Sequence, residues 1–231
     1  AGVSNPRGIT MEMQDAFGNT AMVNHDSYQY LALRVVLPGG LSTSASYNYR
    51  TFQAEMLTDA NLNRTAYRYT PLGFLERSAL LGKDGASEGD TLDDPGVRLE
   101  YNINAFMTSG QPISIRTIQR EEHIQSSSSA ATIEAVEFTD GFGRLLQTRT
   151  QAEDVLFGAS ALGDANLSSD QSASNQAATG VERQGNDPLN VVVSGWKVYN
   201  NKGWVIEQFE PFYSSGFDYA ADSGTGQRVR N

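Results

Sequence analysis

A short turn recurs along this chain and limits the folds that it can adopt. Each copy opens on Asp, Asn or Pro and closes on glycine: Asp15-Ala16-Phe17-Gly18, Pro71-Leu72-Gly73, Asp140-Gly141-Phe142-Gly143 and Asn200-Asn201-Lys202-Gly203. In three copies an aromatic residue lies just upstream, namely Tyr69, Phe138 or Tyr199. Asp, Asn and Pro start tight turns, and glycine supplies the positive φ that closes a hairpin. Each copy therefore predicts one antiparallel β-hairpin. Asp59 opens a degenerate fifth copy, in which Leu62 stands where glycine is expected.

The segments between the turns alternate as strands do. Over residues 64–69, Thr65, Tyr67 and Tyr69 fall on one face, and the other three residues fall on the opposite face. The same alternation occurs over residues 46–50, 113–118, 132–138 and 198–209. A lone hairpin is marginally stable, so repeated hairpins must pair edge to edge. The irregular spacing of the copies favours a sheet with loops of variable length over a short-period solenoid. The sequence therefore predicts an all-β, antiparallel fold.

Two stretches interrupt this pattern. Residues 82–96 form a polar, glycine-rich connection that carries five acidic residues, Asp84, Glu88, Asp90, Asp93 and Asp94. Residues 158–188 are rich in Ser, Ala, Gln, Asn, Asp and Gly. Such a composition buries little apolar surface, so residues 158–188 predict a low-complexity insertion loop within one repeat segment, 1–231.

Composition excludes several classes of function. The chain has 27 acidic and 17 basic residues, a net charge of −10, which disfavours nucleic acid and anionic lipid as partners. It has no cysteine and only two histidines, so we expect no disulfide, no metal site and no cofactor. No apolar run approaches the length of a membrane-spanning helix. The start, Ala1-Gly2-Val3, shows no signal peptide, and we expect the chain to be an internal segment of a longer protein.

The turns and several longer strings resemble the YD repeats of RHS proteins. The strings run over residues 58–65, 71–74, 82–83, 88–90, 116–123, 140–144 and 194–203, and the last continues over residues 208–213. Together they resemble the RHS region of the B component of bacterial insecticidal Tc toxin complexes, whose front part is shared with the Salmonella plasmid virulence protein B family. The resemblance covers most of the chain, from about Met11 to Tyr219.

This resemblance implies a strip of hairpins that curves or spirals into a hollow shell, of which the chain is a wall segment. In the family the B component closes the shell with the C component, encloses the unfolded toxin segment of C, and docks on the pore-forming A component through a β-propeller that this chain lacks. The implied partners are therefore C and its cargo, with A contacted indirectly, in a secreted, extracellular virulence complex. No enzyme activity and no membrane insertion are implied.

The candidate site residues are then structural turn residues: Asp15, Gly18, Asp59, Pro71, Gly73, Asp140, Gly143, Asn200 and Gly203. Gly143→Val or Gly203→Val is expected to abolish soluble expression, because a branched side chain disfavours positive φ. A wall segment separated from the rest of the shell would have unpaired strand edges. We therefore expect this chain to self-associate.

Catalytic interpretations of four features are weaker. Ser42-Thr43-Ser44 resembles a motif of mono-ADP-ribosyltransferases, but the required Glu-x-Glu is missing, and we interpret the three residues as polar residues at a strand edge. The acidic stretch matches no EF-hand spacing, so a solvated loop is favoured over a calcium site or a metal-dependent enzyme. Thr139-Asp140-Gly141 resembles an aspartic-protease signature, but Asp140 opens a repeat turn. No carboxylate pair stands out as that of a glycosidase.

The alternative function is a YD surface that binds carbohydrate or protein through its aromatic residues. Such residues more often form cross-strand pairs that stabilise a sheet. The aromatic residues concerned are Tyr28, Tyr30, Tyr47, Tyr49, Tyr67, Tyr69, Trp196, Tyr199, Trp204, Phe209, Phe212 and Tyr213.

Overall fold

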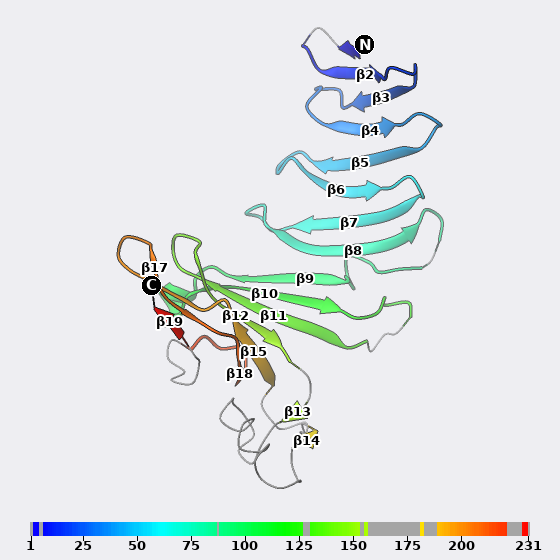
Figure 1. Cartoon of the computed structure of the whole chain (residues 1–231). Coiled ribbons are helices and arrows are strands. Elements are labelled where there is room, and N and C mark those ends of the chain that lie inside the picture. The colour runs from blue at the N-terminus through cyan, green and yellow to red at the C-terminus, as the bar shows by residue number, and fades with distance from the viewer. Residues whose placement is uncertain are drawn as a thin grey trace. The chain divides into compact units, whose positions relative to one another are not determined.

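The computed structural model describes residues 2–4, 7–86, 88–126, 130–152, 155–156, 181–182, 189–220 and 228–230. Nearly all regular structure among them is antiparallel β-strand, which confirms the all-β prediction (Figure 1). The chain divides into two compact units. The first contains residues 1–98 and 119–132, and the second contains residues 99–118 and 133–231. Apart from residues 181–182, the insertion predicted over 158–188 lies outside the described residues.

The first unit is a meander in which each strand pairs with the next one along the chain. Short turns join successive strands, so alternate turns lie on the same side of the sheet (Figure 1). The strands are β1 (Gly2–Ser4), β2 (Thr10–Gln14), β3 (Thr20–His25), β4 (Ala32–Val36), β5 (Ser42–Asn48), β6 (Gln53–Thr58), β7 (Asn63–Tyr69), β8 (Leu75–Lys83) and the start of β9 (Val97–Asn102).

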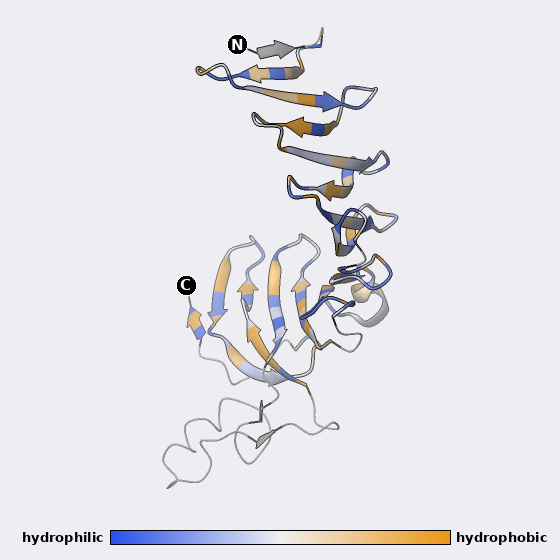
Figure 2. Cartoon of the chain, turned by 90° about the vertical axis from the view of Figure 1, so that its right-hand side faces the viewer, coloured by the Kyte–Doolittle hydropathy of each residue, from blue (hydrophilic) through white to orange (hydrophobic). Residues whose placement is uncertain are grey.

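The register of these strands gathers apolar side chains on one face of the sheet. Val23 pairs with Val35, and Ala45 pairs with Leu57. Leu57 pairs in turn with Thr65, which pairs with Leu80. Directly opposed residues share a face, so these side chains form a ladder across β3 to β8. Leu57 is 41% exposed and Leu80 is 53% exposed, so the apolar ladder is only partly covered (Figure 2 shows the hydropathy of the strands).

The second unit combines three sheets and one helix. Its main sheet has the order β9, β10 (Ile113–Arg120), β11 (Thr132–Thr139), β12 (Leu145–Gln151), β15 (Asn190–Ser194) and β18 (Phe212–Ser215). A second sheet contains β16 (Lys197–Tyr199), β17 (Val205–Phe209) and β19 (Arg228–Arg230), and a third pairs β13 (Val155–Leu156) with β14 (Val181–Glu182). The helix α1 (Ala105–Ser109) ends at Gly110, whose N–H donates to the carbonyl of Phe106. Within the described ranges, no helix is long and apolar enough to cross a membrane.

The core of the second unit lies between its main sheet and β16–β17. Val191, Val193, Trp196 and Phe212 are at most 4% exposed and pack together. The ring of Trp196 stacks on Phe209 with centroids 4.0 Å apart. Aromatic stacking of this kind stabilises by about 0.5–1.5 kcal/mol beyond the area it buries. Trp196, considered above as a surface residue for binding sugars, is therefore a core residue.

Two local predictions need correction. The strand expected over residues 46–50 ends at Asn48, because the Asn48 side chain accepts the N–H of Arg50 at 3.0 Å and starts a turn. The polar run Ser42-Thr43-Ser44 lies in β5, between β4 and β6, rather than at a sheet edge. The Ser42 hydroxyl there accepts a hydrogen bond from Arg34 at 3.1 Å.

Candidate functional site

The turn residues build one recurring hydrogen-bonded unit, seen in full at Asp140. The N–H of Asp140 donates to the carbonyl of Arg144 at 3.0 Å, and the N–H of Gly143 donates back to the carbonyl of Asp140 at 3.0 Å. The Asp140 carboxylate accepts the N–H groups of Phe142 at 2.9 Å and Arg144 at 3.0 Å. The strand pairing shifts register between Phe138 and Thr139, immediately before the turn. The result is a tight turn followed by a glycine bulge, one of the common hairpin connections.

Asp15, Asp59 and Asn200 make the same pair of side-chain bonds to the amides two and four residues ahead. The distances from the accepting oxygen to these amides are 2.9 and 2.9 Å for Asp15, 2.8 and 2.8 Å for Asp59, and 2.9 and 3.0 Å for Asn200. The carboxylates of Asp15 and Asp59 also accept an amide N–H from the side chain of Asn19 or Asn63 at 2.8 Å. Because these bonds favour the ionised acid, the side-chain bond to the asparagine first, they lower the pKa of both residues.

The fourth position of each turn has positive φ, as glycine allows. The values are 87° at Gly18, 86° at Gly73, 76° at Gly143 and 82° at Gly203. Leu62 takes the same conformation at 67°. Leucine therefore occupies a position that a Cβ atom disfavours.

The sequence analysis placed Pro71 at the opening position of its turn, which Asp140 and Asn200 occupy in theirs. The structure shows that Pro71 does not occupy this position. Thr70 does: its N–H donates to the carbonyl of Phe74 at 2.8 Å, and its hydroxyl accepts the N–H of Phe74 at 3.1 Å. The N–H of Gly73 closes the turn on the carbonyl of Thr70 at 2.9 Å. Pro71 is the next residue, where its fixed φ suits the turn. A threonine hydroxyl replaces the carboxylate at the opening position, a substitution that the Asp, Asn or Pro pattern did not reveal.

Two turns of the second unit pack together around Arg144. Its guanidinium pairs with the Asp140 carboxylate at 2.6 Å and lies 4.6 Å from the ring centroid of Tyr199. The Tyr199 hydroxyl donates to the carbonyl of Leu145 at 3.0 Å. A Cβ atom placed on Gly203 would lie 2.7 Å from Nη1 of Arg144. Glycine at position 203 therefore suits the positive φ and leaves room for the Arg144 guanidinium in its present position.

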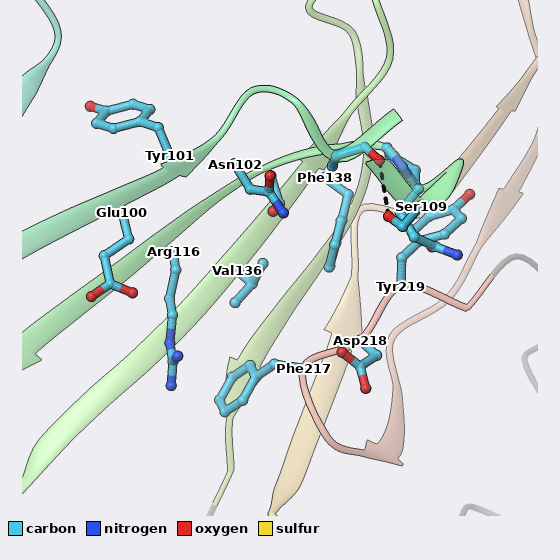
Figure 3. Close-up of a pocket in the computed structure, with 14 residues that line it drawn as sticks. Glu100, Tyr101, Asn102, Ser109, Arg116, Val136, Phe138, Phe217, Asp218 and Tyr219 are labelled. Carbon is cyan, nitrogen blue, oxygen red and sulfur yellow. Dashed lines mark hydrogen bonds between the residues drawn. The ribbon is translucent and has the colours of Figure 1, made fainter. Parts of the chain in front are cut away.

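The second unit also contains a cavity of about 660 Å³, within the usual range of ligand pockets (Figure 3). Strands β9, β10 and β11 supply one side, and α1 and the segment after β18 supply the rest. The lining residues are Glu100, Tyr101, Asn102, Ala105, Ser109, Gln111, Pro112, Ser114, Arg116, Val136, Phe138, Phe217, Asp218 and Tyr219.

Both aromatic and charged groups line this cavity. Phe138 is buried and lies 5.3 Å from the ring of Tyr219. The Arg116 guanidinium lies 5.7 Å from the centroid of Phe217 and pairs with the carboxylate of Glu134, whose oxygen is 3.0 Å from Nε. Burial raises the pKa of the Tyr101 and Tyr219 hydroxyls. The Ser109 hydroxyl donates to the Ala105 carbonyl at 2.9 Å rather than to a base. The arrangement suits holding a chain or ligand with mixed polar and apolar groups.

Two residues that the sequence analysis missed hold one wall of the cavity. Arg149, 3% exposed, donates to the carbonyls of Ser215 at 3.2 Å and Gly216 at 2.9 Å. Gln147, fully buried, accepts the Nε–H of Arg149 at 2.9 Å and donates to the carbonyl of Ala220 at 3.2 Å. Together they fasten residues 215–220 to β12. The available signal was a polar pair two residues apart, which lies on one face of the strand that follows the turn at Gly143.

The acidic stretch of residues 82–96 is tied to basic partners in the first unit. Asp84 pairs with Arg64 at 3.1 Å, and Asp93 pairs with Arg68 at 3.5 Å. Asp90 is 4% exposed, unlike a residue of a solvated loop.

The buried Asp90 carboxylate collects three partners from one segment. It accepts the N–H of Ile124 at 2.9 Å, lies 3.0 Å from Nδ1 of His123, and lies 3.6 Å from Arg120. Across the described residues, no three histidine or acidic side chains gather as a metal site would require.

Solved structures of Tc toxin components share this fold. No protein-family model matches the chain, and no curated protein matches it. The crystal structure of TcdB2-TccC3 matches with a TM-score of 0.63 and 19% identity over 89% of this chain and 10% of that one. TcdB2-TccC3-TEV matches with a TM-score of 0.68 and 15% identity over 92% of this chain and 13% of that one. A chain of the Tc holotoxin pore of Photorhabdus luminescens matches with a TM-score of 0.63 and 15% identity over 93% and 13% of the respective chains.

The chain thus spans between 10% and 13% of the length of the structures it matches. Its hairpin sheet has the fold found in these toxin-complex chains.

Proposed function

We propose that the chain is a wall segment of a toxin-encapsulating RHS shell in a Tc-type complex, and that it encloses cargo rather than catalysing a reaction. The observation that carries the proposal is the series of paired hairpins closed by one repeated turn, in a fold shared with TcdB2-TccC3. The C component and its toxin segment would be the direct partners, with the A component contacted through other parts of the complex. The complex would act outside the producing cell.

The distribution of side chains in the first unit supports an enclosing role. A sheet that has an apolar face and is only partly covered needs a partner on that face, because large exposed apolar patches are uncommon in isolated soluble proteins. The ladder from Val23 to Leu80 would lie against unfolded cargo, whose apolar residues are exposed. In the second unit, the cavity beside Arg116 and Phe217 offers a further place for an extended chain.

Protease protection of the cargo in the complete toxin complex tests this role. The toxin segment should survive digestion in the wild-type complex and should be cut faster when Gly143→Ala and Gly203→Ala, which are milder than the valine substitutions expected to abolish soluble expression, are introduced together. Leu62→Gly, which keeps a turn-compatible residue, is the matched control and should leave protection intact. If the cargo is digested as fast in the wild-type complex as in the complex with both glycine substitutions, the enclosing role is refuted.

A further inference from the structure

Four aromatic side chains project from two turns on the same side of the first unit. Tyr28 and Tyr30 lie in the turn between β3 and β4, and Tyr49 and Phe52 lie in the turn between β5 and β6 (Figure 1). Their exposed fractions are 61, 69, 47 and 55%, respectively. We refer to these four residues as the aromatic platform.

The rings of the aromatic platform form a continuous series. Tyr28 and Tyr30 are nearly parallel, with centroids 6.4 Å apart and an interplanar angle of 16°. Tyr28 meets Tyr49 edge to face at 5.9 Å, and Tyr49 meets Phe52 edge to face at 6.5 Å. Two turns separated in sequence therefore present one joined aromatic surface.

A buried carboxylate holds the two turns together. Asp26 is 5% exposed, and it accepts the N–H of Tyr30 at 2.7 Å, the N–H of Leu31 at 3.1 Å and the hydroxyl of Tyr49 at 2.9 Å. Loss of solvent raises the pKa of Asp26, but the bonds from Leu31, Tyr49 and Tyr30 outweigh this and leave the pKa below its usual value. The acid is thus ionised and fixed at neutral pH, so the rings are held in place before any ligand arrives.

Two arginine side chains also restrain the turns that carry the aromatic platform. Arg7 donates to the carbonyl of Tyr28 at 3.1 Å. Arg50 donates to the carbonyls of Thr70 at 2.9 Å and Pro71 at 2.6 Å, in the next turn on the same side. These bonds restrict the turns that carry the aromatic platform.

Phe52 has a backbone conformation that is unfavourable for a residue with a bulky side chain. Its φ is 56°, in the left-handed region where a bulky side chain is an outlier. Other turns of this sheet use glycine for positive φ, for example Gly18, Gly40 and Gly73, although Gln29 and Leu62 also have positive φ. More than half of the Phe52 side chain is exposed, so burial does not compensate for the strain. Leu62 is as strained and as exposed, so the strain at Phe52 supports a binding role only together with its ring contact to Tyr49.

The chemistry of the aromatic platform selects among ligands. The acid that bonds to it, Asp26, is buried, and the two arginines that restrain its turns already donate to main-chain carbonyls. The chain as a whole carries a net charge of −10, which opposes polyanions. Electron-rich ring faces attract the polarised C–H groups of a sugar ring, and tyrosine hydroxyls can hydrogen-bond sugar hydroxyls. Four rings on two turns offer a small surface, which suits an extended oligosaccharide better than the roughly 800 Å² that each partner buries in a standard protein interface.

We propose that Tyr28, Tyr30, Tyr49 and Phe52 form a binding site for a neutral oligosaccharide. The site lies on the turns of the first unit and is separate from the sheet face assigned to cargo. Sugar rings would stack on Tyr28 and Phe52 and hydrogen-bond to the tyrosine hydroxyls.

The test uses the full 231-residue chain and immobilised neutral hexasaccharides of β-glucan, α-glucan, chitin and xylan type. Binding to at least one of them is expected, with at least a tenfold loss for Phe52→Gly and for Tyr28→Ala, and retention for Phe52→Tyr. Leu62→Gly is the matched control. Leu62 also has positive φ and an exposed side chain, but its turn lies on the opposite side of the sheet. Both glycine variants should melt at or above the wild-type temperature, which separates lost binding from lost folding.

Three results would overturn the proposal. The first is failure of the wild-type chain to bind any of the four glycans. The second is equal binding by Phe52→Gly and the wild-type chain. The third is binding of a proline-rich peptide by the same residues in the absence of glycan binding, which would assign the aromatic platform to polypeptides instead.

Discussion

Replacing Gly203 by alanine is expected to destabilise the protein in two ways, through backbone strain and through crowding of Arg144. Alanine at φ 82° costs roughly 1–2 kcal/mol of backbone strain. Its Cβ would also lie 2.7 Å from Nη1 of Arg144, so the end of this flexible side chain must shift from its place over the ring of Tyr199. A cation over an aromatic ring contributes about 0.5–2 kcal/mol. We therefore expect Gly203→Ala to lower the free energy of unfolding by about 1.5–4 kcal/mol, from the sum of these terms.

Gly143→Ala is the matched control for this prediction. Gly143 has a similar φ of 76°, but a Cβ placed there would meet no atom within 4 Å. Only the strain applies, so the expected loss is roughly 1–2 kcal/mol. Both glycines belong to the second unit, which simplifies the comparison.

Urea unfolding followed by tryptophan fluorescence measures both losses. The two tryptophans, Trp196 and Trp204, lie in the second unit, so the signal follows the unfolding of that unit. In an Arg144→Ala background the loss from Gly203→Ala should fall to that of Gly143→Ala, because the cation is gone. Equal losses for the two glycine variants with Arg144 present would refute the role assigned to this close approach.

Three further outcomes follow from the same contacts. Leu62→Gly should raise the free energy of unfolding by roughly 0.5–1 kcal/mol in calorimetry, because relief of strain exceeds the added freedom of the unfolded chain; an unchanged or lower value would contradict the strain. Asp140→Asn should flatten the acid side of the stability profile. Burial raises the pKa of Asp140, but bonds from Arg144 and Phe142 outweigh it and leave the pKa below 3.8, so its contribution is present above 3.8 and lost as pH falls through the lower folded value; an unchanged acid profile in urea titrations would count against this. Asp90→Ala should speed amide hydrogen exchange at Ile124 at least tenfold relative to His123→Ala, because only the carboxylate accepts that N–H; equal rates in the two variants would show that the contact is not protective.

Turn chemistry acts over a few residues, which explains what could be predicted from the sequence. Asp15, Asp140 and Asn200 each bond to amides two and four residues ahead, so their identity and the glycine that follows indicate the hairpin. Alternation of side chains then indicates strands, and repeated hairpins indicate a sheet. The same local rule failed at Pro71, because a threonine hydroxyl at Thr70 provides the acceptor that an aspartate provides elsewhere.

The all-β class, the hairpin series and the positions that need glycine were predictable from the sequence, since those depend on neighbours within one turn. Which polar residues are buried and which aromatic residues meet follows instead from the folding of the whole chain. Arg149 and Gln147 reach carbonyls 66 and 73 residues away, and Tyr49 reaches Asp26 across 23 residues. Such contacts depend on strand register and on the packing of distant segments, because a buried polar group must find its partner wherever the fold brings one.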